Sequence, residues 1–289
     1  MIELPGPTPV RLCCPMTTRN APSQDELDTR LYMASVERTM RILAAFDNGL
    51  GSRTLADIAK QLDLGRSAVQ RIVYTLEKLG YLEREADQRH YRLTLKILDL
   101  SSGLTSTGSL MRLIQPVLQD LADETGETSS WVKLDGDEIV IQQTVRSKHL
   151  GHVSFAPGQR FAALPSSSGQ AILAKGDPKV AESLLAAAGP ALRTRIAFAD
   201  AAEMAARFAE IRAQGVATTA KEEDLFSVSI SAPVLSSSGV VLGALNVSAL
   251  ESRVPHTRIS EQLGAPIQAA AARVAKILEH QAAAGVNAL

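Results

Sequence analysis

The stretch Gly65-Arg66-Ser67-Ala68-Val69-Gln70-Arg71-Ile72-Val73-Tyr74-Thr75-Leu76-Glu77-Lys78-Leu79-Gly80 decides the fold of the first third of the chain. Its pattern predicts a helix that starts with a capping box of Ser67 and Gln70 and ends at Gly80 in the left-handed conformation. Apolar residues recur along one side at helical spacing, so this side should face a core. These residues are Val69, Ile72, Val73, Leu76 and Leu79.

The opposite side of this predicted helix carries hydrogen-bond donors. An arginine can pair with guanine O6 and N7, a glutamine can pair with adenine, and serine, tyrosine and lysine can reach phosphates. The donors are Arg66, Ser67, Gln70, Arg71, Tyr74 and Lys78. The alternative is an ordinary amphipathic helix with a mixed polar face.

The neighbouring segments favour the DNA-reading interpretation. Upstream, 54–57 resembles the start of another helix, whose apolar face would consist of Leu55, Ile58, Ala59 and Leu62. A tight turn at 63–65 would connect this helix to the next, which is helix-turn-helix spacing. Downstream, 81–84 and 90–93 are predicted strands around a polar tip, with Arg89 near the phosphate backbone or a minor groove. A winged helix-turn-helix is therefore expected. An earlier helix, with Val36, Met40, Leu43 and Phe46 towards the core, should support it.

Composition limits the functional classes. The chain has 289 residues, 45% hydrophobic residues and a net charge of −1, which is typical of a soluble protein with two domains. Residues 31–100 contain eleven Lys and Arg against nine Asp and Glu, so DNA binding must depend on placement rather than on bulk charge. Cys13 and Cys14 are the only cysteines, and no signal peptide or membrane span is predicted. A reducing, cytoplasmic compartment is expected.

The rest of the chain predicts an α+β domain with one antiparallel sheet. A helix ending at Gly126 precedes a hairpin of 130–134 and 138–145 around Asp135-Gly136-Asp137. An extended piece at 152–155 follows, then helices at 168–175, 178–187 and 200–214. A strand at 216–220, a hairpin of 227–235 with 240–249, and a helix from Ile259 to about His280 complete the domain. The expected organisation is a flexible tail (1–30), a winged helix-turn-helix (31–93), a linker helix (94–112) with a hinge at 103–108, the α+β domain (113–282) and a second tail (283–289).

This order of parts resembles the IclR family of bacterial transcriptional regulators from residue 35 to 280. The motifs that carry the resemblance are Ser35-Val36-Glu37-Arg38, Leu64-Gly65-Arg66-Ser67 with Gln70-Arg71, Leu121-Ala122-Asp123-Glu124-Thr125-Gly126-Glu127-Thr128, Gly169-Gln170-Ala171-Ile172-Leu173-Ala174, Glu222-Glu223, and Ser231-Ala232-Pro233-Val234 with 239–248. The resemblance implies a dimer or dimer of dimers, a linker helix that helps to form it, and a C-terminal effector-binding domain related to GAF folds. It also implies DNA contacts by Arg66, Ser67, Ala68, Gln70 and Arg71; Ala68 stands where the family often has Thr.

The effector site implied by the resemblance combines a loop that enters a helix with the last two strands. The candidate residues are Ser166, Ser167, Ser168, Gly169, Ser229, Ile230, Ser231, Asn246 and Ser248. Hydroxyls and free N–H groups at a helix N-terminus suit a small organic acid. The alternatives are that the three consecutive serines only cap the helix and that Ser227, Ser229 and Ser231 lie on a solvated strand face. An acid and a cysteine that are typical of the family are replaced here by Ala220 and Ile230, so the identity of the effector is open.

The predicted function is a homo-oligomeric regulator that binds double-stranded operator DNA and responds to a small organic acid. Tyr74 and Arg89 are further predicted DNA contacts. Repression of a catabolic operon is expected, with activation as the alternative. His149 and His152 form a His-x-x-His pattern, but two histidines are weak grounds for a metal, and no cofactor is expected. An enzyme is disfavoured, because no cysteine follows Cys14 and no nucleophile elbow or phosphate-binding glycine loop occurs.

Overall fold

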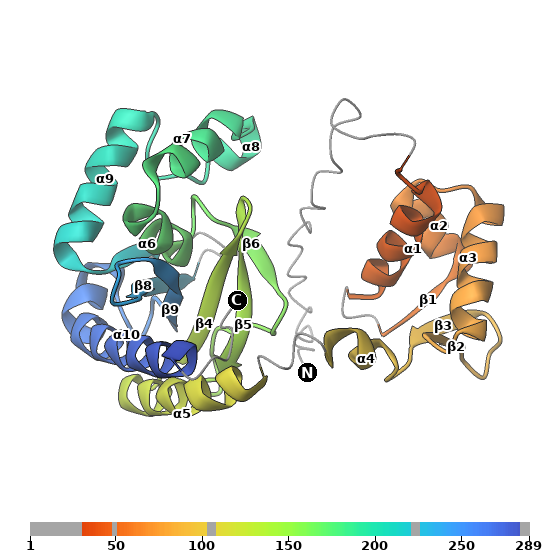
Figure 1. Ribbon diagram of the computed structural model, residues 1–289, viewed down its shortest axis with the longest axis horizontal. Coiled ribbons are helices and arrows are strands. Elements are labelled where there is room, and N and C mark those ends of the chain that lie inside the picture. Colours follow the sequence, from red (N-terminus) through yellow and green to blue (C-terminus); the bar gives the residue numbers. More distant parts are fainter. Residues whose placement is uncertain (1–30, 48–50, 103–107, 221–225, 284–289) are drawn as a thin grey trace, which may run out of the picture. The chain divides into compact units, whose positions relative to one another are not determined.

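The computed structural model describes residues 31–47, 51–102, 108–220 and 226–283. The contacts divide the chain into two compact units, one within Thr18–Ser106 and one within Thr107–Leu289. Each unit has its own core and is described separately (Figure 1). The predicted tails, the two cysteines, most of the predicted hinge and the Glu222-Glu223 motif lie outside the described residues.

The first unit is a winged helix-turn-helix, as predicted. Three helices pack beside a small antiparallel sheet of strand order β1-β3-β2. The elements are α1 (Ala34–Ala44), η2 (Ala45–Asp47), β1 (Ser52–Thr54), α2 (Leu55–Leu62), α3 (Arg66–Lys78), β2 (Leu82–Arg84), β3 (His90–Leu93) and α4 (Ile97–Ser102). Strand β1 was not predicted, because three residues are too few to show an alternating pattern.

The two helix starts of this unit differ. A reciprocal capping box of Thr54 and Asp57 begins α2. The capping box predicted at Ser67 is wrong: Gly65 is the N-cap of α3 and offers no side-chain cap, and the N–H groups of Ala68 and Val69 already donate to the Gly65 carbonyl. Ser67 therefore lies inside the first turn, with its hydroxyl exposed beside the other polar residues of α3.

The core of the first unit corrects two of the predicted apolar faces. Val69, Val73 and Leu76 are buried as expected, whereas Leu79 is 52% exposed, because α3 ends at Lys78 and Gly80 turns the chain at φ +81°. In α1 the residue that enters the core is Ile42. Val36 and Met40, predicted to be buried, are exposed on the outer side of this helix.

The second unit is an α+β domain around a six-stranded antiparallel sheet of order β6-β5-β4-β9-β8-β7, again as predicted. Its elements are α5 (Gly108–Thr125), β4 (Thr128–Asp135), β5 (Glu138–Val145), β6 (Arg160–Ala162), α6 (Ser167–Lys175), α7 (Pro178–Ala187), α8 (Pro190–Arg193), α9 (Ala201–Gln214), β7 (Ala217–Ala220), β8 (Ser227–Leu235), β9 (Val241–Leu250), η4 (His256–Arg258) and α10 (Ile259–Ala283). The short β6 and α8 were not predicted. The extended piece at 152–155 does not join the sheet.

The two faces of the larger sheet are covered differently. Helices α5 and α10 lie together on one face, and the cluster beneath them is apolar across β4, β8 and β9 (Figure 1). Helix α6 covers the other face, with α7 and α9 packed behind it. The apolar cluster on this second face is joined by polar side chains from the central strands. The sheet therefore offers one conventional core face and one face that is partly polar.

Candidate functional site

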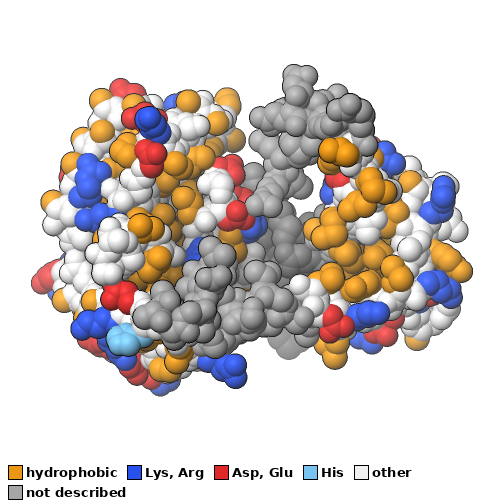
Figure 2. All heavy atoms as spheres, in the orientation of Figure 1, with side chains coloured by type: hydrophobic (Ala, Val, Ile, Leu, Met, Phe, Trp, Pro, Cys, Tyr) orange, Lys and Arg blue, Asp and Glu red, His pale blue; other side chains and the backbone are white. Residues whose placement is uncertain are grey.

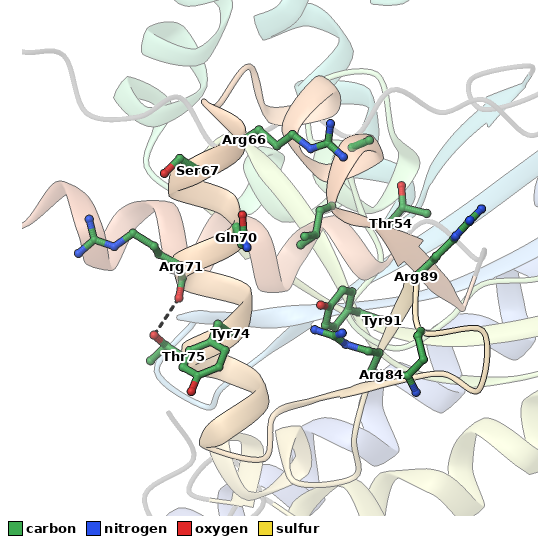
Figure 3. A pocket seen from close by; sticks show the side chains of 13 residues that line it. Thr54, Arg66, Ser67, Gln70, Arg71, Tyr74, Thr75, Arg84, Arg89 and Tyr91 are labelled. Atoms are coloured by element: carbon green, nitrogen blue, oxygen red, sulfur yellow. Dashed lines mark hydrogen bonds between the residues drawn. The ribbon is translucent and has the colours of Figure 1, made fainter.

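A hollow of about 1010 Å³ lies between α3 and the wing formed by β2 and β3 (Figure 3). The start of α2, the exposed side of α3 and the wing contribute its walls. The residues are Thr54, Leu55, Ala56, Arg66, Ser67, Gln70, Arg71, Tyr74, Thr75, Arg84, Gln88, Arg89 and Tyr91. The hollow therefore unites residues that the sequence had placed on a predicted recognition helix and at a predicted wing tip.

Six of the seven residues predicted to contact DNA line this hollow, and Ala68, which is half-buried, does not. Figure 3 shows that Arg66 extends across the hollow towards Thr54, whereas Arg71 points away from the wing. The Thr75 hydroxyl donates to the Arg71 carbonyl at 2.9 Å. The hydroxyl of Thr75 is thus engaged within the helix, while the Arg71 guanidinium extends outward.

Sequence analysis missed Arg84 and Tyr91, which lie on the wing side of the hollow. The two residues face each other in the register of β2 with β3, and the Arg84 guanidinium lies over the Tyr91 ring, 5.0 Å from its centroid. The Glu77 carboxylate is 3.7 Å from Arg84. Strand alternation could have identified Arg84. Residues two apart lie on the same side of a strand, so Arg84 shares the side of β2 on which Leu82 enters the core.

The charge of the hollow differs from that of its unit. Four arginines line it, at positions 66, 71, 84 and 89, and the described lining residues include no Asp or Glu. Residues 31–100 as a whole have an excess of only two positive charges. A cleft lined by charge of one sign concentrates counter-ions of the other sign, which favours a polyanion. Placement rather than bulk charge makes this hollow basic.

The wing tip is a hydrogen-bonded turn built on Asp87. Its Oδ1 accepts from the N–H groups of Arg89 and His90 at 2.9 and 3.0 Å, and its Oδ2 pairs with His90 Nδ1. These bonds hold the pKa of Asp87 at about 2, the backbone donors being the larger cause. The hydrogen bond to Asp87 raises the pKa of His90. Arg89, at this turn, lines the hollow.

Metal binding has little support among the described residues. Glu85, Asp87 and His90 are near enough to share an ion, but the hydrogen bonds of the wing turn already account for their arrangement. His149 and His152 belong to no described group of three potential ligands. The ring Nδ1 of His152 is instead 2.8 Å from the His149 carbonyl oxygen.

The second unit has a polar patch on the α6 face of its sheet. Cross-strand pairing aligns Thr144, Ser130, Asn246 and Ser231 in one row, and Thr128, Ser248, Ser229 and Thr219 in the next. Ser231 and Ser248 are fully buried, so the alternating serines of β8 do not form a solvated face. Sequence analysis missed Thr128, Ser130, Thr144 and Thr219, although the two-residue spacing of Thr128 and Ser130 within β4 was visible.

A hydrogen-bond network connects this patch to the start of α6. Ser167 and Ser168 place their hydroxyl oxygens 2.9 Å from the Ser231 hydroxyl oxygen. The Asn246 amide donates to Ser231 at 3.1 Å, and Ser248 donates to the amide oxygen at 2.8 Å. The Ser229 and Ser248 hydroxyls are 2.9 Å apart. We refer to Ser167, Ser168, Ser229, Ser231, Asn246 and Ser248 as the serine–asparagine network.

The remaining predicted effector residues have other positions. Ser166 is the N-cap of α6 and accepts from the Gly169 N–H at 3.0 Å. Gly169 packs so closely on Ala163 that a Cβ atom would lie 2.0 Å from the Ala163 carbonyl oxygen. Ile230 is fully buried in the apolar cluster under α5 and α10, on the opposite face of the sheet from the network. Of the three consecutive serines, only Ser166 is thus a helix cap, and its two neighbours join the network.

Comparisons with known proteins cover both units. The IclR helix-turn-helix domain matches residues 35–86, and the C-terminal domain of the bacterial transcriptional regulator IclR matches residues 103–276. A Pca regulon regulatory protein of Pseudomonas putida is 32% identical over 243 residues, which are 84% of this chain and 82% of that protein. A p-hydroxybenzoate hydroxylase transcriptional activator of Acinetobacter baylyi is 26% identical over 246 residues, covering 83% and 90%.

A solved transcriptional regulator from Rhodococcus sp. RHA1 superposes with a TM-score of 0.72 at 28% identity, covering 89% of this chain and 100% of that chain. The helices of the described residues include none that is both long and apolar enough to cross a membrane.

Proposed function

Since the chain belongs to the IclR family of bacterial transcriptional regulators, we propose that it binds operator DNA through the hollow between α3 and the wing. The chain is a DNA-binding transcriptional regulator. The concentration of four arginines in this hollow is the observation that carries the assignment of the site. Arg71 and Gln70 read bases in the major groove, and Arg66, Arg84 and Arg89 contact phosphates.

The regulator acts as a homodimer or a dimer of dimers. One two-fold DNA site requires two recognition helices about one helical turn, or a multiple of it, apart. An exposed apolar stripe on α1 supports self-association, because Met33, Val36 and Met40 are each more than half exposed at helical spacing. Hydrophobic side chains gather over this helix in Figure 2.

The effector is a small organic acid bound at the serine–asparagine network. The first N–H groups of α6 and the hydroxyls of Ser167 and Ser168 supply donors for a carboxylate without any buried cation. Most of the polar patch is buried, and buried polar groups are normally hydrogen-bonded, so a ligand that completes their hydrogen bonding is favoured there. Binding of the acid favours one arrangement of the dimer and thereby changes operator affinity.

The regulator represses a catabolic operon in the cytoplasm; activation is the second candidate, because the related Acinetobacter protein is a transcriptional activator. An enzyme is set aside, since the named relatives are regulators.

The test is a footprint and a salt-dependent titration on the DNA upstream of the protein's own gene. Wild type should protect a two-fold-related site, and Arg71→Ala should fail to protect it at the lowest protein concentration at which wild type protects it fully. Lys60→Ala is the matched control, because Lys60 is an exposed cation on α2 outside the hollow. Protection that survives Arg71→Ala, or that Lys60→Ala removes equally, contradicts the assignment of the hollow.

The proposed effector site is tested with Ser231→Ala, by repeating the DNA titration in the presence of a panel of organic acids. This variant should retain operator binding and lose the response to the acid. A response that is unchanged in Ser231→Ala contradicts the assignment of the effector site, whatever the result for DNA.

A further inference from the structure

Thr219 has a buried hydroxyl without a partner in the part of the chain that the structure describes. The residue is 8% exposed, and on β7 it faces Ser229 of β8 in the same row of the polar patch. A buried hydroxyl that forms no hydrogen bond is costly, and native proteins rarely leave one unsatisfied. Thr219 thus marks a place beside Ser229 where a polar group is expected.

The direction of each hydrogen bond in the network, from donor to acceptor, determines which kind of group fits beside Ser229. Ser248 donates its only proton to the amide oxygen of Asn246, which can only accept. The Ser229 hydroxyl is bonded to Ser248, so Ser229 must be the donor in this pair. Ser229 therefore has only acceptor capacity left, and the group that joins it must donate a proton.

The α6 end of the network has the opposite character. Ser231 accepts from the Asn246 amide and shares one proton between its contacts with Ser167 and Ser168. It can donate to only one of these two serines, and the serine that accepts keeps its own proton. A hydroxyl donor therefore remains at the N-terminus of α6, beside N–H groups that have no acceptor within the helix. This end fits an acceptor such as a carboxylate.

We propose that the effector is a hydroxy acid that binds with its carboxylate at Ser167 and Ser168 and its hydroxyl between Ser229 and Thr219. The effector site of the proposed function is the premise of this assignment. The hydroxyl donates to Ser229 and accepts from Thr219, which satisfies both side chains. A carboxylate in that place would meet the lone pairs of Ser229. Because Ser229 and Ser231 are two residues apart on one strand, the two groups of the ligand are separated by roughly 7 Å.

The experiment measures binding to the full-length protein by calorimetry with two matched series of acids. The aromatic series is 4-hydroxybenzoate, 4-methoxybenzoate and benzoate, and the aliphatic series is 5-hydroxypentanoate, 5-methoxypentanoate and pentanoate. In at least one series the hydroxy acid should bind about tenfold or more tightly than the methyl ether, which can only accept, and than the unsubstituted acid.

Thr219→Val keeps the side-chain shape, removes the hydroxyl and should remove most of this preference, while the affinity for the unsubstituted acid stays the same. The variant should fold normally, because it deletes an unpartnered buried hydroxyl, and the fluorescence of the single tryptophan, Trp131, reports on the fold. Thr218→Val is the matched control, since Thr218 pairs with Ile230 on the opposite face.

Each outcome separates this inference from the effector proposal. If the methyl ethers bind as tightly as the hydroxy acids, or if Thr219→Val retains the preference, the hydroxy-acid assignment is overturned while acid binding still supports the effector site. If no acid in either series binds, the effector proposal is overturned, and the hydroxy-acid assignment with it.

Discussion

The arginine-lined hollow and the serine–asparagine network are both built where a helix start meets a strand, yet the binding proposed for each depends on opposite physical means. The hollow is open, and its four guanidiniums have few partners among the described residues, Arg84 with Glu77 and Tyr91 being the exception. The network is neutral and buried except for the half-buried Ser229, and its hydroxyls bond to one another. Exposed charge provides long-range attraction with little selectivity among polyanions, whereas buried neutral groups select a ligand by the direction of each hydrogen bond. Changes that affect one site should therefore spare the other.

The largest expected effect is on the packing that holds the network. Gly169→Ala places a Cβ atom 2.0 Å from the Ala163 carbonyl oxygen, so backbone must shift, and we expect a loss of about 3 kcal/mol in the free energy of unfolding of the second unit. Urea denaturation followed by Trp131 fluorescence measures it.

Gly264→Ala is the control for that change, because nothing lies within 4 Å of its Cβ position and alanine favours a helix by about 0.5–1 kcal/mol. The hollow should keep its DNA affinity in both variants at low temperature. Equal stability of the two variants would contradict the role of the close contact at Gly169.

The next effect separates two arginines within the hollow. Arg71→Ala should cost about 1–3 kcal/mol on the operator and little on scrambled DNA, because its guanidinium points outward from α3 (Figure 3) and is proposed to read base edges. Arg89→Ala should weaken binding to both DNAs equally. Binding titrations on the two DNAs at one salt concentration measure the difference, and an equal loss of specificity in both variants would refute the division of roles.

Salt should distinguish the two sites. If Arg66, Arg84 and Arg89 of one hollow each neutralise one phosphate, a plot of the logarithm of the affinity against the logarithm of the salt concentration should have a slope of about −2.7, and Arg89→Ala should reduce the steepness of this slope by about 1. Binding of an organic acid to the neutral network should respond weakly, since buried contacts are little screened. Steep salt dependence of acid binding would place a cation in that site.

The smallest effect is a pH dependence confined to the wing. The raised pKa of His90 adds stability below its unfolded value near 6.5, and this stability is lost as pH rises through the folded pKa. The lowered pKa of Asp87 adds stability above about pH 4, which is lost as pH falls towards about 2. The stability difference between wild type and Asp87→Asn should therefore be greatest between about pH 4 and 6.5.

Thermal unfolding across that range measures this difference, because asparagine keeps one oxygen as acceptor for the two backbone N–H groups of the turn and loses the charged oxygen that pairs with His90. Ser231→Ala is the comparison in the other site. Its cost should stay constant with pH, since the network contains no titratable side chain. A difference for Asp87→Asn that is flat with pH would show that the ion pair adds nothing to the wing.

Much of the fold could be predicted because its signals are local. The spacing of Val69, Val73 and Leu76 marks α3, and Asp135-Gly136-Asp137 marks the β4–β5 hairpin. The errors occur where local patterns conflict with packing. Val36 and Met40 have the spacing of a core face, but Ile42 occupies the core and leaves them outside. At Ser67 the carbonyl of Gly65 starts the helix before a side chain can cap it.

The sequence by itself determined the order of most elements and most of the predicted residues that line the hollow, because helical and strand periodicity are properties of adjacent residues, and its motifs indicated the family. Only the tertiary structure decided that Arg84 joins the hollow, that Ile230 faces away from the network, and that Thr219 lies opposite Ser229. The contact between Ser168 and Ser231 spans 63 residues. Such pairs depend on strand register and helix packing, and these are set by the whole core rather than by the residues that they bring together.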